Sequence, residues 1–284
     1  MFPILKSLTA IRIALFSCCC LASAQSFAQS NFATEQLLTI AEKEQKVYKR
    51  LAENPRFYSD ADLERQLNAL TQSYSTYLTD HPDEVEALIL YGKLLRRMNQ
   101  PEAAFNAFLK ADEIDPQIAV VKQQIGTYLA ETGKGKAALT FYLQAIELEP
   151  DTAVYHFALG QLLYGFKTQF IEEEIFTIDA IDRQMIKAFQ QALLLEADNF
   201  DFQMRLGEAF YDLASPDWKS AMLHWNKVRK TTDTELRSEI IDLHRTRVLG
   251  KLGRMEEAKA LLETIQQPSL QQSRQQVLAE LTQF

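Results

Sequence analysis

From residue 32 to the end of the chain, apolar residues recur three or four positions apart, with charged and polar residues between them. This spacing places the apolar side chains on one face of an α-helix. The pattern predicts helices over 32–54 and 59–79, then a series of helix pairs, and a last helix from residue 269. Glycine and proline are few, at 9 and 8 of 284 residues, and most fall at repeat positions or turns. A β-rich domain would need more turn residues, so the pattern predicts an all-α fold.

Between residues 85 and 150 one sequence pattern occurs twice, with matched positions 34 residues apart. Each copy predicts a helix with a central glycine, then a helix with small and aromatic residues, and a closing proline. The first copy contains Leu88, Tyr91, Gly92, Leu95, Ala104, Phe108, Ala111 and Pro116, and the second contains Ile125, Gly126, Leu129, Ala138, Tyr142, Ala145 and Pro150. A fixed period of this length is typical of stacked helix pairs.

Glycines recur inside the predicted helices, at Gly92, Gly126, Gly160 and Gly207. A glycine in a helix interior costs about 1 kcal/mol relative to alanine. These positions must therefore gain something from the missing side chain. We expect that they let a neighbouring helix approach closely, with aromatic residues such as Phe108 filling the space between the helices.

These residues resemble the tetratricopeptide repeat (TPR) family, whose 34-residue unit has Leu-Gly and Tyr positions followed by Ala, Phe and Pro. The resemblance implies an all-α, right-handed solenoid of TPR helical hairpins, with about five units and a C-terminal capping helix. It gives clean repeats at 85–118 and 119–152, altered repeats at 153–199 and 200–233, and degenerate units at 32–82 and 239–268. Residues 29–284 would then form a single solenoid domain.

The repeat at 153–199 contains an insertion, because Gly160 and Gly207 lie 47 residues apart instead of 34. The extra residues fall between about 165 and 182. They are too rich in phenylalanine and isoleucine for a freely solvated loop. We expect a helical extension or a short extra helix that packs on the solenoid.

Residues 1–28 have the features of a secretory signal peptide. Lys6 and Arg12 precede an apolar run over 13–24, and Ser26-Phe27-Ala28 offers a cleavage site, with cleavage after Ala24 as the alternative. Because all three cysteines lie in this leader, the mature chain would contain none. We therefore expect export, to the periplasm if the source is bacterial, while a eukaryotic secretory route stays open.

A second interpretation of the leader is a lipoprotein signal. The stretch 15–18 resembles a bacterial lipoprotein box, in which one of Cys18, Cys19 or Cys20 would carry the lipid. The bulky Phe16 departs from that pattern. Contact with a membrane is expected only under this interpretation.

Charge and motif content disfavour several classes of function. The leader holds two of the 30 basic residues and none of the 38 acidic ones, so the mature chain has a net charge of −10. Binding of nucleic acid through clustered cations is therefore disfavoured. The four histidines, at 81, 156, 224 and 244, lack metal-ligand spacing, and the run Glu172-Glu173-Glu174 reads as a solvated face. The sequence predicts no catalytic residue, cofactor or metal site.

A stripe beside the packing positions of each first helix is the candidate binding surface. In TPR proteins this stripe commonly lines the concave groove that holds partner peptides, so the resemblance implies a protein or peptide partner. The candidate residues are Ile89, Lys93, Arg96, Arg97, Gln123, Thr127, Phe157, Gln161, Tyr164, Met204, Glu208 and Tyr211. The alternative is that the aromatic members are covered by the insertion or by neighbouring helices.

The main hypothesis is therefore an exported TPR scaffold that mediates protein–protein interaction or complex assembly without catalysis. One alternative is a lipid-anchored envelope-biogenesis factor with the same fold. Another is an enzyme whose site is built on the scaffold.

Overall fold

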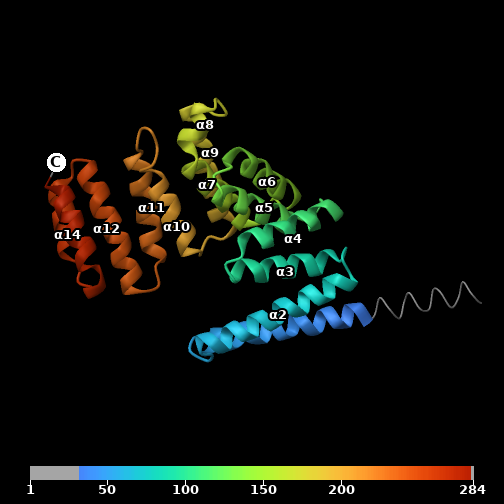
Figure 1. The fold of residues 1–284 in the computed structure, drawn as a ribbon. Coiled ribbons are helices and arrows are strands. Elements are labelled where there is room, and N and C mark those ends of the chain that lie inside the picture. Colours follow the sequence, from blue (N-terminus) through green and yellow to red (C-terminus); the bar gives the residue numbers. More distant parts are fainter. Residues whose placement is uncertain (1–31, 283–284) are drawn as a thin grey trace, which may run out of the picture. The chain divides into compact units, whose positions relative to one another are not determined.

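The computed structural model describes residues 32–282, and these residues form α-helices joined by short turns (Figure 1). The prediction of an all-α fold is confirmed. The chain divides into two compact units, residues 1–128 and 129–284. The predicted signal peptide at 1–28, with Cys18, Cys19 and Cys20, lies outside the described residues. No helix within residues 32–282 has both the length and the apolar composition needed to cross a membrane.

The first unit begins with two long helices that lie side by side, over 32–53 and in α2 (Asp60–Asp80) (Figure 1). The Ser59 hydroxyl accepts a hydrogen bond from the Asp62 amide and so caps the start of α2. Then follow α3 (Val85–Arg97), α4 (Pro101–Ile114) and α5 (Ala119–Glu131), near whose end the division falls. The core that the first hairpin shares with α3 includes Leu37, Ile40, Val47, Leu70, Tyr74, Tyr77, Ala87 and Leu94.

The second unit contains the remaining helices in an antiparallel succession. They are α6 (Gly135–Leu148), α7 (Ala153–Gly165), α8 (Lys167–Glu172), α9 (Ile178–Leu195), α10 (Phe200–Ala209), α11 (Trp218–Thr231), α12 (Glu235–Lys251), α13 (Met255–Glu263), the 3-10 turn η1 (Pro268–Leu270) and α14 (Gln271–Leu281). Helix α7 packs on α9, and α12 packs on α11, α13 and α14. Helix α12 starts four residues before the degenerate unit predicted at 239.

The helix glycines sit where the aromatic side chains of second helices pack. A Cβ atom at Gly92 would lie 2.8 Å from the Phe108 ring, and one at Gly160 would lie 2.6 Å from the Phe189 ring. Gly207 meets Trp225 in the same way. The close approach expected at these three positions is therefore present, and the aromatic rings occupy the space that a side chain would need.

The insertion forms a short helix, α8, together with the turn that follows it. Phe170 of α8 is fully buried, and its ring lies 6.0 Å from that of Phe166 and 5.9 Å from that of Phe176. The Lys167 ammonium forms an ion pair with Asp182 of α9 and donates to the Asp212 carbonyl at 2.9 Å. The insertion is thus a packed part of the unit, as its apolar composition predicted.

Candidate functional site

A groove of about 520 Å³ crosses several first helices of the second unit. Helix α7 supplies two of its residues, α10 and the turn after it supply four, α12 supplies two and α14 supplies one. We call it the first-helix groove, and its lining residues are Gln161, Tyr164, Arg205, Glu208, Tyr211, Asp212, His244, Arg247 and Glu280. Side chains three or four residues apart share a helix face, which is why Gln161 and Tyr164 enter together, as do His244 and Arg247.

One wall of the groove is a stack of aromatic rings. His244 lies over Trp225 with ring centroids 4.4 Å apart, and Tyr211 lies over His244 at 6.2 Å. The Tyr211 hydroxyl accepts a hydrogen bond from the Trp225 indole N–H. Burial, and then the charge of Arg247, lower the pKa of His244 to about 4, so this ring is neutral at pH 7. Burial also raises the pKa of the Tyr211 phenol.

Both arginines of the groove already have carboxylate partners. Arg205 Nη1 lies 2.8 Å from Asp212 Oδ2, and its Nε donates to Gln161 Oε1 at 2.9 Å. The Arg205 guanidinium also lies 4.3 Å from the centroid of the Tyr164 ring. On the other side Arg247 makes two hydrogen bonds to Glu280, of 2.7 and 3.1 Å, which raise the pKa of its guanidinium.

Glu208 differs from these residues. Its side chain is half-buried in the groove, yet within residues 32–282 its carboxylate makes no hydrogen bond and no ion pair shorter than 4 Å. Burial, opposed by Arg205 and reinforced by Asp212, raises the pKa of this carboxyl group. The groove therefore contains a partly desolvated carboxylate whose hydrogen-bonding capacity is unused.

The structure brings together four of the twelve candidate residues: Gln161, Tyr164, Glu208 and Tyr211 all line the first-helix groove. Met204 is half-buried and does not line it. Phe157 packs between helices instead, because its ring stacks on Phe202 at 4.5 Å. Phe157 lies three residues before Gly160, so both face the Phe189 ring. The structure therefore supports the alternative interpretation for Phe157, in which neighbouring helices cover its ring.

The other six candidates belong to the first unit and form no part of this groove. Ile89, Lys93 and Arg96 are half-buried on α3, whereas Arg97 is exposed at the end of that helix. The Arg97 guanidinium donates to Glu44 at 3.2 Å and lies 4.1 Å from the centroid of the Tyr48 ring. It thereby joins the first hairpin to α3. On α5, Gln123 donates to the Thr127 hydroxyl at 3.0 Å.

Sequence reasoning did not propose Arg205, His244, Arg247 or Glu280 as site residues. Arg247 could have been found, because Gly250 is a buried helix glycine like Gly207. Aligning the two glycines places Arg247 at the position of Met204, on the candidate stripe. Glu280 had no such signal, since it lies in the capping helix beyond the repeats.

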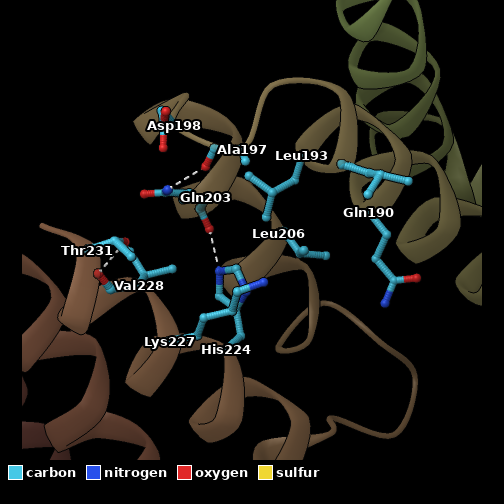
Figure 2. A pocket seen from close by; sticks show the side chains of 11 residues that line it. Gln190, Leu193, Ala197, Asp198, Gln203, Leu206, His224, Lys227, Val228 and Thr231 are labelled. Carbon is cyan, nitrogen blue, oxygen red and sulfur yellow. Dashed lines mark hydrogen bonds between the residues drawn. The ribbon is translucent and has the colours of Figure 1, made fainter. Parts of the chain in front are cut away.

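A second pocket, of about 350 Å³, lies among α9, α10 and α11 (Figure 2). Its lining includes the aliphatic residues Leu193, Leu206 and Val228, and two of its polar side chains, those of His224 and Gln203, are hydrogen-bonded within the unit. His224 Nε2 lies 2.7 Å from the Gln203 carbonyl oxygen, and the Gln203 amide donates to the Ala197 carbonyl at 2.7 Å. The first-helix groove is the better candidate, because it combines aromatic rings with a half-buried carboxylate that has no partner, whereas the Asp198 carboxylate of the second pocket is exposed. Across residues 32–282 no group of three or more potential metal ligands is present.

Comparison with known proteins gives one family match and a set of similar structures. Residues 85–118 match the tetratricopeptide repeat family. No curated protein matches the sequence of the chain. Helices α3 and α4 both lie within this stretch.

Three solved structures illustrate the structural likeness. PilF of Pseudomonas aeruginosa has a TM-score of 0.56 and 15% identity, over 84% of this chain and 97% of that one. YrrB, described as a TPR protein with an unusual peptide-binding site, has a TM-score of 0.53 and 14% identity, over 68% and 90%. MamA from Desulfovibrio magneticus RS-1, from residue 41 to its end, has a TM-score of 0.51 and 17% identity, over 69% and 97%. At these identities the likeness concerns the fold, so the chain has the all-α solenoid fold of TPR proteins.

Proposed function

We propose that this chain is an exported, non-catalytic scaffold that binds a segment of a partner protein in the first-helix groove. The observation that carries the proposal is the groove itself, in which four helices present aromatic rings and a carboxylate without a partner. Helical repeat proteins characteristically bind partners on such surfaces. The peptide-binding site named for YrrB, which has the same fold, supports this function. Export rests on the composition of residues 1–28.

Site-specific photo-crosslinking tests the binding surface. A photoreactive phenylalanine analogue replaces Tyr164, whose side chain is 46% exposed in the groove, and the protein is incubated with extract from its source cells. The matched control replaces Leu223, which is 72% exposed on α11 outside the groove. We expect a discrete crosslinked protein from position 164 and none from position 223.

The crosslink should also be lost when unlabelled wild-type protein competes, and it should persist when unlabelled Tyr164→Ala protein competes. Large aromatic side chains at the centre of an interface commonly carry much of its binding free energy. Equal crosslinking from both positions, or none from position 164, would show that the groove is not the binding surface.

A further inference from the structure

The charges of the first-helix groove specify the chemistry of its occupant. We infer that the partner segment presents a lysine or arginine side chain to this groove, where it forms an ion pair with the Glu208 carboxylate. This inference rests on the proposed function.

When the charged groups of the groove are paired, one negatively charged group remains without a partner. Three carboxylates, of Glu208, Asp212 and Glu280, line the groove with two guanidiniums, of Arg205 and Arg247. Arg205 is bound to Asp212 and Arg247 to Glu280, whereas Glu208 lies in neither pair. His244 adds no charge, since burial keeps its pKa near 4. The groove therefore has a net charge of −1 at pH 7, and a single cation would balance it.

An acidic or phosphorylated segment fits this arrangement poorly. To pair with Arg205 or Arg247 it would have to compete with a carboxylate at 2.8 or 2.7 Å, and a displaced carboxylate would lose its own partner. The Nη2 atom of Arg205 has no hydrogen-bond partner among the described residues, but it is buried away from the groove surface. It would also approach Glu208, which repels an anion. Juxtaposed like charges disfavour wrong partners, so the groove selects against anionic segments.

A cationic side chain, in contrast, supplies what Glu208 lacks. Burial has removed part of the water from this carboxylate without providing a donor in return, and this is the main cause of its raised pKa. A bound segment would exclude more water, which strengthens the attraction between the carboxylate and an ammonium or guanidinium group. The proton donors of the cation would then occupy the free acceptor sites.

The aromatic residues of the groove suit the rest of such a side chain. Tyr211 lies three residues after Glu208, and Tyr164 faces the same groove from α7. The apolar stems of lysine and arginine pack along aromatic surfaces while their charged ends reach a polar partner. The Arg205 guanidinium already packs on the Tyr164 ring, 4.3 Å from its centroid, and the Tyr164 side chain still has 46% of its surface exposed.

Peptide selection tests the inference. A random peptide library displayed on phage is selected in parallel on the full mature chain as wild type, Glu208→Gln and Glu208→Lys. The matched control is Glu263→Gln, which changes an exposed carboxylate on α13 outside the groove. Circular dichroism verifies that each variant is folded. We expect lysine or arginine at a fixed position of the wild-type peptides, and the same preference with Glu263→Gln.

Synthetic copies of the selected peptides then give affinities. Glu208→Gln should weaken binding of a basic peptide about tenfold or more, and replacing the basic residue of the peptide by norleucine should have little further effect on that variant. Glu208→Lys should select peptides with an acidic residue instead. Peptides that lack a basic preference, or that bind Glu208→Gln as tightly as wild type, would overturn the inference and leave the proposed function standing. If no peptide binds the wild-type groove, the proposed function fails and the inference fails with it.

Discussion

At the scale of single residues, the contact between a helix glycine and an aromatic ring sets the spacing of each helix pair. Gly160 lies in the middle of α7, and Phe189 of the paired helix α9 occupies the space beside it with only 1% of its surface exposed. The ring cannot move aside easily because protein cores are close-packed. The helix-propensity cost of the glycine is thus offset by a contact that no other residue permits.

We predict that Gly160→Ala lowers the free energy of unfolding by about 1–3 kcal/mol, because its Cβ atom would lie 2.6 Å from the Phe189 ring. The matched control is Gly165→Ala at the end of the same helix, where a Cβ atom would meet nothing within 4 Å. That variant should be neutral or slightly more stable, since alanine favours helix. Urea denaturation measures both. Equal stabilities for the two variants would show that the close approach at Gly160 is unimportant.

At the scale of elements, the insertion is held to the rest of the second unit by polar contacts as well as by Phe170. The Lys167 ammonium at the start of α8 pairs with Asp182 of α9, and both side chains are mostly buried, with 16% and 13% exposed. The second oxygen of Asp182 accepts from the Ala214 amide at 2.8 Å. These contacts join α8, α9 and the turn between α10 and α11, next to the groove residue Asp212.

We predict that Lys167→Met destabilises the protein by about 2–4 kcal/mol, because it leaves the Asp182 carboxylate buried without its cation. Asp182→Asn in the same chain should recover part of this loss, since a neutral amide needs no counter-charge. The control is Lys259→Met, which breaks an exposed pair with Glu256 and should change stability by less than about 1 kcal/mol. A double-mutant cycle by urea denaturation tests the pair, and strictly additive effects would contradict it.

The repeat period predicted the helix pairs because apolar, small and glycine positions are fixed by contacts between neighbouring helices. Where these contacts depart from the repeat pattern, the sequence predicted the structure in less detail. The apolar residues near Phe170 indicated a packed insertion, but only the structure shows that α8 is held by Lys167. Phe157 was misplaced because a helix offers two adjacent apolar stripes, and the stacking of Phe157 on Phe202 decides which one is covered. Long-range pairs such as Arg247 with Glu280 leave no local signal in the sequence.

At the scale of the whole molecule, the response to acid sums over every group whose pKa differs between the folded and unfolded chain. Burial lowers the pKa of His244 to about 4 and also lowers that of His224. In the unfolded chain an ordinary histidine takes up its proton near pH 6.5. Between these two values the unfolded chain binds more protons than the folded one, so acid favours unfolding.

We predict that the free energy of unfolding falls as the pH decreases from about 6.5 to about 4, with a contribution from His244 of up to about 3 kcal/mol. His244→Phe keeps a flat ring that can stack on Tyr211 and Trp225 but takes up no proton, so its stability should fall less over this interval. Below about pH 4 the folded wild type is protonated too, and the two proteins should respond alike. Arg247, Glu280 and Glu208 line the groove beside this ring in both proteins, so their charges largely cancel in the comparison. Urea denaturation at several pH values measures the difference. If the variant loses as much stability as the wild type between pH 6.5 and 4, the ring is protonated in the folded chain and its place in the aromatic stack does not exclude the charge.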